Sequence, residues 1–378
     1  MGTGFFSKLT GQKTGNLKSC LLQFKLCMEE RSYYMTNRQE LNIAIIGCGV
    51  ICPEHIKAYR MIPGVQVHTL CDLVPEKAGK MAEQYQIPYV TTTAENIWNS
   101  PEIDAVSICT DHFSHCQLAV AALKAGKHVL CEKPLSSCKE NMDRMVEEGK
   151  KHPELVFSGV FQHRFNPLYR YVRDLLQSGR FGKILNTVMV MECLRTREYY
   201  EADQWRGKWQ TEGGSLLMNQ AIHTLDIYQW LLGGVAEVCG KFDNLAHQGI
   251  IETEDTAVAV LRFRNGALGT VSSSSASQLG WERIIQIFGT ESTLELRNAQ
   301  LVNFSSNNAE LQEQVCREIN ELKQVQIANQ EKSYYGIGHP AQIADFVEAI
   351  RQKRRPYVTA EDARDAVILA QKILGRCC

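Results

Sequence analysis

The fold is decided by LNIAIIGCGVIC, residues Leu41 to Cys52. Its first six residues are mostly aliphatic and predict a buried strand, which Gly47 and Gly49 follow directly. A helical pattern runs from Pro53 to Met61, and a second apolar run, Val65 to Cys71, predicts the next strand. These segments form one strand, helix, strand unit.

The same alternation continues further along the chain. We expect helices over 75–85, 94–99 and 114–125, and strands over 89–91, 105–109 and 128–131. Strands that alternate with helices of this length predict a doubly wound α/β fold, in which helices cover both faces of a parallel sheet.

The second half of the chain is rich in strands. One strong helix begins after Gly214, and residues 303–332 are polar and only weakly helical. We expect strands over 155–162, 184–193, 235–242, 256–264, 266–275, 281–288 and 292–296, and helices over 167–177, 339–352 and 360–374. The predicted division is an extension over 1–40, a first domain over 41–157, a second over 158–335 and terminal helices over 336–378.

Composition excludes several classes of protein. The chain has 378 residues, 44% of them hydrophobic, and 41 basic against 42 acidic residues, so no net charge favours nucleic acid or an anionic membrane. No apolar run approaches the roughly 20 residues that cross a bilayer. The 14 cysteines form no CxxC pair and no zinc spacing, so we expect no metal site and reduced thiols in the cytoplasm.

Residues 1–40 carry scattered lysines and a short apolar stretch that is too charged for a signal peptide. We expect a disordered extension, or a start assigned upstream of Met35, rather than a functional leader.

The glycine turn fits a dinucleotide phosphate site. Gly47 permits the tight turn, and Gly49 lets backbone N–H groups approach a pyrophosphate at the positive end of the following helix. Cys52 stands where the fingerprint has its third glycine, so a plain glycine turn is the alternative. Asp72, at the end of the second strand, is placed to accept the ribose hydroxyls, which favours NAD over NADP. Otherwise Asp72 is a turn residue.

The segment AGKHVLCEKPL places Glu132 and Lys133 at the carboxyl end of a buried parallel strand, where ligands of open sheets bind. A lysine beside a carboxylate can polarise a substrate hydroxyl or relay its proton. The alternative is a surface lysine before a helix.

The helix after Gly214 has apolar residues all around its axis, interrupted by one stripe of polar residues. At 100° per residue, Asn219, His223 and Asp226 share one arc. A neutral imidazole there suits the removal of a hydroxyl proton. The alternative is a core histidine bonded to Asp226. The preceding loop, 196–214, offers aromatic faces and Arg206 to a ligand, or is an ordinary surface loop.

Together, GCGVIC, AGKHVLCEKPL, FQHRFNP, WRGKW and GGSLLMNQAIHTLD resemble the Gfo/Idh/MocA oxidoreductases, from Leu41 to the C-terminus. The resemblance implies a Rossmann domain and a C-terminal α/β domain with an open mixed sheet, NAD as the cofactor, and a homodimer or homotetramer. The family lysine corresponds to Lys133, and its carboxylate and histidine correspond to Asn219 and His223, so an amide replaces the acid. Asp111 and His112 also depart from the usual family pattern.

The pattern resembles branches that oxidise carbon 3 of a pyranose, in sugar nucleotides or glycosides. We therefore expect a sugar dehydrogenase. The alternatives are an NAD-dependent glycosidase that oxidises carbon 3 transiently, and a dinucleotide-binding regulator without turnover. The expected catalytic residues are Lys133, Asn219 and His223. Expected cofactor contacts are Gly47, Gly49, Val50, Ile51, Asp72, Thr110, His112, His115, Glu132, Lys133, Gln162, Trp205 and Arg206; expected substrate contacts are Lys133, Arg164, Tyr200, Asn219 and His223.

Overall fold

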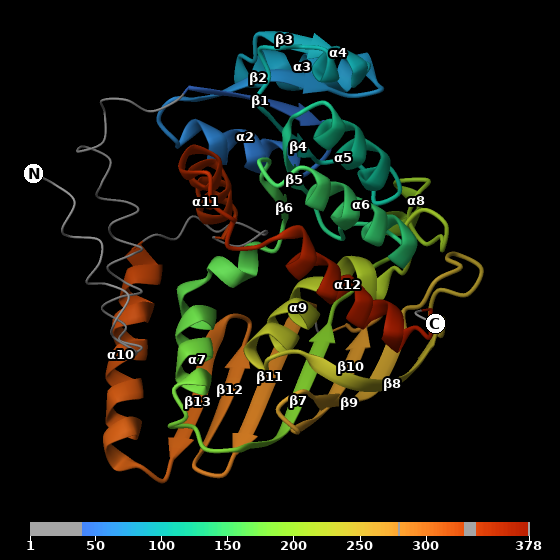
Figure 1. Ribbon diagram of the computed structural model, residues 1–378. Helices are drawn as coiled ribbons and strands as arrows, with labels where there is room; N and C mark the ends of the chain where they lie inside the picture. Colours follow the sequence, from blue (N-terminus) through green and yellow to red (C-terminus); the bar gives the residue numbers. More distant parts are fainter. Residues whose placement is uncertain (1–39, 279, 329–337, 377–378) are drawn as a thin grey trace, which may run out of the picture.

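The computed structural model describes residues 40–278, 280–328 and 338–376, which form two lobes (Figure 1). The first lobe contains a six-stranded parallel sheet of order β3-β2-β1-β4-β5-β6, so the doubly wound α/β prediction is confirmed. Its strands are β1 (Leu41–Ile46), β2 (Val65–Cys71), β3 (Tyr89–Thr91), β4 (Ala105–Ile108), β5 (His128–Cys131) and β6 (Phe157–Gly159), and its helices are α2 (Cys52–Arg60), α3 (Pro75–Tyr85), α4 (Glu95–Trp98), α5 (His115–Lys124) and α6 (Lys139–Lys151).

Strand β1 is apolar from Ile43 to Ile46 because both faces of its sheet are covered. Ile43 and Ile45 pack into the cluster that includes α2 residues, whereas Ala44 and Ile46 pack into the cluster that includes α5 and α6 residues. Alternate side chains of a strand point to opposite faces, so a continuous apolar run is what a central parallel strand requires. The strand order reverses between β1 and β4, and ligands of such sheets bind in the crevice at that point.

The second lobe contains a seven-stranded mixed sheet of order β13-β12-β11-β7-β10-β9-β8, in which β7 and β10 are parallel and the other neighbours antiparallel. One face carries helices, and alternate residues of β9 on the other face, Val258 and Val260, are exposed. Its elements are η3 (Gln162–Phe165), α7 (Pro167–Gln177), β7 (Ile184–Glu192), α8 (Arg197–Glu201), η4 (Leu216–Gln220), α9 (Ile222–Leu231), β8 (Val235–Asp243), β9 (Thr256–Phe263), β10 (Leu268–Ser274), β11 (Glu282–Gly289), β12 (Ser292–Arg297), β13 (Gln300–Ser306) and α10 (Ala309–Ala328).

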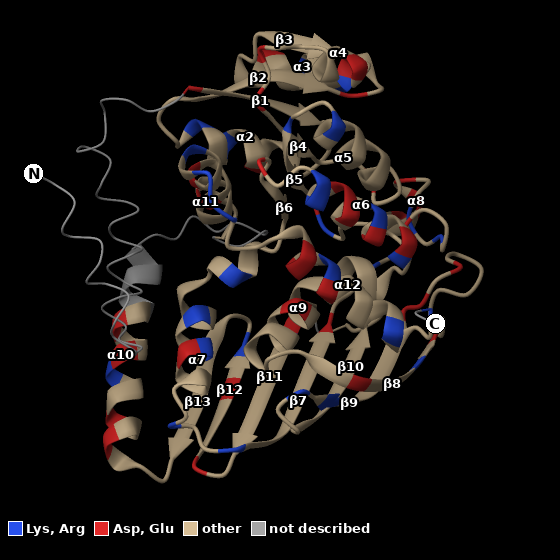
Figure 2. Cartoon of the chain, in the orientation of Figure 1, with Lys and Arg blue, Asp and Glu red and all other residues tan. Residues whose placement is uncertain are grey.

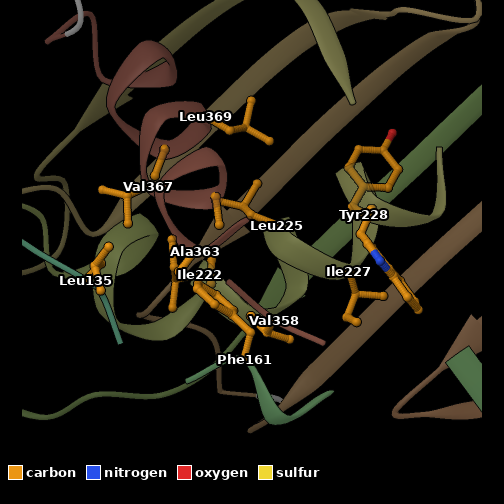
Figure 3. Packing of buried hydrophobic residues seen from close by; sticks show 14 of the residues in the cluster. Leu135, Phe161, Ile222, Leu225, Ile227, Tyr228, Val358, Ala363, Val367 and Leu369 are labelled. Carbon is orange, nitrogen blue, oxygen red and sulfur yellow. The ribbon is translucent and has the colours of Figure 1, made fainter. Parts of the chain in front are cut away.

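The terminal helices α11 (Gly338–Gln352) and α12 (Ala360–Ile373) join the lobes. Helix α11 packs against α2 of the first lobe, and α12 contacts α6 as well as α9. Figure 3 shows side chains of α9 and α12 packed with Leu135 of the first lobe and with Phe161 and Val358, all in one buried cluster. The two lobes therefore share a hydrophobic core.

Several expectations need correction. Helix α6 was not expected, because only its buried Met142, Met145 and Val146 interrupt a strongly polar sequence. The expected strand over 155–162 is shorter and continues as the 3₁₀ helix η3, and the weakly helical stretch after residue 302 divides into β13 and α10. The expected helix after Gly214 also divides, into the π-helix η4 and α9.

The near-neutral composition has a structural counterpart. Acidic and basic residues are interspersed along α6 (Figure 2). Every cysteine within the described residues is a free thiol. Within those same ranges, no helix has the length and apolar character that spanning a membrane requires. Predictions about residues 1–39 lie outside the described residues.

Gly159 sets the approach of α12 to β6, because a Cβ atom there would lie 2.4 Å from Cβ of Ala363. Gly159→Ala is expected to lower the free energy of unfolding by about 1–3 kcal/mol through overpacking. Gly79 lies on the exposed side of α3, and no atom lies within 4 Å of the place that an added methyl group would take, so Gly79→Ala should be neutral or stabilising by up to about 1 kcal/mol. Thermal denaturation of both variants tests this; equal melting temperatures would contradict it.

Candidate active site

The loop after β1 is an open cradle at the start of α2. Gly47 has a φ of +97°, and a Cβ there would lie 2.6 Å from the carbonyl oxygen of Cys109 after β4, so only glycine fits. Nothing lies within 4 Å of the Cβ position of Gly49, and Val50 is 73% exposed. The N–H groups of Gly49, Val50 and Ile51 donate to no residue that the structure describes. Free N–H groups beside a helix N-terminus fit a pyrophosphate.

Asp72 lies beside this cradle at the end of β2. Its Oδ2 accepts the N–H of Cys48 at 2.8 Å, and its Oδ1 accepts the N–H of Val74 at 2.9 Å. These two bonds fix the carboxylate next to the glycine turn, where a ribose would lie. The residues present therefore fit a dinucleotide.

The other expected cofactor residues divide between the crevice and the seam between the lobes. The carbonyl of Thr110 and that of Pro134 both lie within hydrogen-bonding distance of the buried His115 ring. His112 bonds to the carbonyl oxygen of Glu212 at 3.0 Å, and its ring lies 4.8 Å from that of Trp205. The guanidinium of Arg206 stacks on the rings of Tyr199 and Trp205, and Gln162 is buried at the start of η3.

Lys133 and Asn219 meet at the carboxyl end of β5, across the seam between the lobes. The Nζ of Lys133 donates to Oδ1 of Asn219 at 2.9 Å and to its backbone oxygen at 3.1 Å. Burial lowers the pKa of Lys133, and the carboxylates of Glu132 and Glu212 oppose that effect. The structure thus joins the two residues that the sequence placed 86 positions apart.

Glu132 is the centre of a buried network behind this lysine. Its Oε1 lies 3.0 Å from Nε2 of His55 and 3.7 Å from Nε2 of His339, and its Oε2 accepts the backbone N–H of Lys133. His55 continues the network to Ser107. The two histidines hold the pKa of Glu132 well below its usual range despite its burial. Within the described residues, this is the one group of three potential metal-ligand side chains with all ligand atoms within 4.8 Å, and its hydrogen bonds account for its arrangement.

His223 lies one turn beyond Asn219. Its ring lies 5.0 Å from the ring of His163 and 5.7 Å from that of Phe161. Nδ1 is buried without a hydrogen-bond partner among the described residues, which leaves Nε2 as the nitrogen available to the cleft. Burial, together with the positive charge of Lys133, holds the pKa of His223 well below its ordinary value. The imidazole is therefore neutral and able to accept a proton.

The π-helix η4 aims Asn219 at the seam. The N–H of Ala221 donates to the carbonyl oxygen of Leu216 at 2.8 Å, a bond that spans five residues instead of four. Oε1 of Glu254 accepts the N–H groups of Leu216 and Leu217 at the start of this turn. Of the expected stripe, Asn219 and His223 face the site, whereas the Asp226 carboxylate pairs with Arg164.

Two expected substrate contacts, Arg164 and Tyr200, are engaged by other residues of the chain. The guanidinium of Arg164 is held in a buried ion pair with Asp226, at 2.9 and 2.6 Å, and also contacts Asp362 at 3.2 Å. This pairing also removes the alternative in which Asp226 bonds to His223. Tyr200 is buried against Ser275 and the ring of His247. Its neighbour Tyr199 contacts the site instead.

Sequence reasoning missed four residues around Asn219. Nδ2 of Asn219 donates to Oε1 of the buried Glu212 at 2.7 Å and lies 3.3 Å from the hydroxyl of Tyr199. Gln220 donates to that hydroxyl at 2.9 Å and accepts from Arg195. Glu212, Tyr199 and Arg195 stand in or beside the loop 196–214, which the sequence marked as a ligand loop, and Gln220 ends η4; spacing alone did not select these residues.

Comparison with known proteins identifies the chain. Residues 41–160 match the model of the oxidoreductase family with an NAD-binding Rossmann fold, and residues 169–295 match the GFO/IDH/MocA C-terminal domain. The chain belongs to the Gfo/Idh/MocA oxidoreductases. It is accordingly an oxidoreductase with an NAD-binding Rossmann domain, as the resemblance of its motifs predicted.

Individual relatives agree with this family. The chain is 29% identical to myo-inositol 2-dehydrogenase of Thermotoga maritima over 263 residues, which cover 69% of this chain and 76% of that protein. It is 26% identical to levoglucosan dehydrogenase of Pseudarthrobacter phenanthrenivorans over 307 residues, 72% and 78% of the two chains. The crystal structure of the WlbA dehydrogenase of Bordetella pertussis, in complex with NADH and UDP-GlcNAcA, matches with a TM-score of 0.81 at 26% identity, and covers 90% of this chain and 96% of that one.

The cofactor preference of this Gfo/Idh/MocA enzyme is expected to depend on Asp72. Asp72→Ser should weaken NADH binding about ten-fold or more, because hydrogen bonds to a charged acceptor are lost, and should raise the ratio of NADPH to NADH affinity. Fluorescence titration with both nucleotides measures the two dissociation constants. Equal weakening of both would instead limit Asp72 to bracing the loop.

The turn that carries Asn219 should make stability depend on pH. Burial raises the pKa of Glu254 to about 8, above its unfolded value, so the folded state binds the extra proton. The free energy of unfolding that protonation of Glu254 contributes is fully present below about pH 4.5 and is lost as pH rises through 8, at up to about 1.4 kcal/mol per pH unit. Glu254→Gln removes it. Melting temperatures at pH 6 and pH 9 should fall more for the wild type than for the variant; parallel curves would contradict this.

Proposed function

We propose that this enzyme removes hydride from the carbon-3 hydroxyl carbon of a pyranose sugar, glycoside or sugar nucleotide. The observation that carries the proposal is the pair of hydrogen bonds from Nζ of Lys133 to Asn219, one turn before the neutral His223 and next to the dinucleotide crevice. Bound NAD⁺ supplies the hydride acceptor. The side chains then position the sugar and take up its proton.

His223 is the proton acceptor in this proposal. Loss of hydride from a carbinol carbon makes its hydroxyl acidic, and a neutral imidazole takes that proton as the carbonyl forms. Because burial and adjacent positive charge disfavour the imidazolium, the proton passes on after each turnover rather than remaining on the ring.

Lys133 orients and polarises the same hydroxyl. An ammonium group has three N–H donors, and Asn219 accepts two of them through its side chain and its backbone oxygen. The third is available to the substrate oxygen, on which negative charge develops in the transition state. Asn219 thereby fixes the direction in which Lys133 donates.

The choice of carbon 3 rests on two supports. The motif of Asn219, Gln220 and His223 follows the branches that oxidise that position, and the structural match to WlbA is to a complex with a sugar nucleotide. Tyr199, whose ring contacts the guanidinium groups of Arg195 and Arg206, lies beside Asn219 at this site. The homo-oligomer and the cytoplasmic location stay predictions.

Lys133→Met and His223→Phe should each lower kcat at least 100-fold, since general acid–base groups contribute about 10²–10⁴-fold, while the dissociation constant for NADH changes little. Turnover is measured by NADH absorbance against a panel of free sugars, glycosides and sugar nucleotides, with NMR to locate the new carbonyl. Unchanged turnover in both variants would refute the assignment. Glycoside cleavage without NADH accumulation would identify the glycosidase alternative.

The pH dependence of kcat gives an independent test of His223. A proton acceptor whose pKa lies well below 6.5 should leave kcat without an acid limb near pH 6.5. An acid limb centred at pH 6.5 that is lost in His223→Phe would contradict the neutral, buried state of the ring.

A further inference from the structure

One buried carboxylate beside the site has no part in the mechanism above. Glu212, fully buried, lies in the loop before η4 and receives three hydrogen bonds. The backbone N–H of Gly207 and the hydroxyl of Ser215 donate to Oε2, at 2.6 and 2.5 Å, and Nδ2 of Asn219 donates to Oε1 at 2.7 Å. Two of these bonds brace the loop, but the third connects Glu212 with Lys133 through a single amide.

The carboxylate determines which way that amide faces. Burial raises the pKa of Glu212, whereas the three donated hydrogen bonds and Arg206 favour its ionised form. An ionised carboxylate can only accept hydrogen bonds, so the side of Asn219 that meets it is the NH₂ group. The carbonyl oxygen Oδ1 is then the atom that faces Nζ of Lys133, at 2.9 Å. Without an acceptor behind it, the amide could rotate and present donors to an ammonium group.

Glu212 also supplies a negative charge, which the neighbouring Asn219 amide lacks. Position 219 is an amide in this chain, so no carboxylate touches Lys133 from the helix side. Glu212 and Glu132 both favour the charged form of Lys133, whereas burial, Arg195 and Arg206 oppose it. The Glu212 carboxylate therefore acts on Lys133 across the Asn219 amide and not by direct contact.

We propose that Glu212 is a positioning residue for Lys133: it orients the Asn219 amide and provides, through it, the single negative charge that the lysine needs on this side. The inference rests on the proposed role of Lys133. It implies that one negative charge must lie within the pair of residues 212 and 219, and that either residue can carry it.

Four proteins test the charge requirement: wild type, Glu212→Gln, Asn219→Asp and the double variant. Glu212→Gln keeps the shape but has no charge in the pair, and kcat should fall at least ten-fold with little change in KM. Asn219→Asp places two carboxylates in contact, which cannot both ionise, so activity should depend on a new proton. The double variant returns to one charge and should recover to within about three-fold of wild type.

A second readout does not require turnover. Reductive methylation of Lys133 at graded pH, mapped by mass spectrometry, reports the pKa of its amine. Its midpoint should fall by about one unit in Glu212→Gln, as expected for loss of a nearby opposite charge, and return in the double variant. Asp255→Asn is the matched control, because Asp255 is a buried carboxylate of the same lobe whose hydrogen bonds go to residues 245–247 and to Thr256.

The outcomes separate the two proposals. Melting temperature and NADH affinity verify that each variant is folded. If Glu212→Gln is as active as wild type, or the double variant is no better than Glu212→Gln in both readouts, the positioning role is overturned. If no sugar is oxidised but the methylation midpoints follow the expected order, the positioning role stands and the proposed function fails.

Discussion

The ammonium group of Lys133 is the charge on which the site depends. It lies at the seam between the lobes, where burial disfavours its charged form, and it is held by two hydrogen bonds to Asn219. A partly desolvated cation is useful because it acts strongly on an oxygen that gains negative charge, but it persists only where acceptors surround it. Much of the nearby architecture supplies those acceptors and keeps them in place.

The irregular turn η4 is one such device. The N–H of Ala221 donates to the carbonyl oxygen of Leu216 across five residues, and Asn219, near the end of this turn, receives both hydrogen bonds from Lys133. The turn is stabilised from outside by Glu254, whose carboxyl accepts its first two N–H groups. The buried Glu254, which lies just before β9, thus stabilises the π-helical turn η4.

Sequence reasoning predicted the first lobe well and the second lobe only in outline. Runs such as Ile43 to Ile46 are apolar on both faces and are followed by glycine, which is a strong signal for a central parallel strand. The joining of Lys133 to Asn219 followed from motif resemblance. The sequence did not reveal contacts between remote segments. Arg164 was expected to contact the substrate, but in the fold its guanidinium pairs with Asp226 and Asp362. The short helix α8 determines which of Tyr199 and Tyr200 lies beside Asn219. Periodicity carries no information on either.

The charge balance of Lys133 also explains why the two lobes belong together. Glu132 lies on the first lobe and is kept ionised by His55 of α2 and His339 of α11, whereas Glu212 lies on the second lobe and acts through Asn219. His112 ties the lobes directly by its bond to the backbone of Glu212. Neither lobe alone surrounds the lysine with acceptors. Lys133 is therefore surrounded by acceptors only where the shared core of α9 and α12 holds both lobes in contact. The terminal helices thus maintain the site, although they contribute no reacting group.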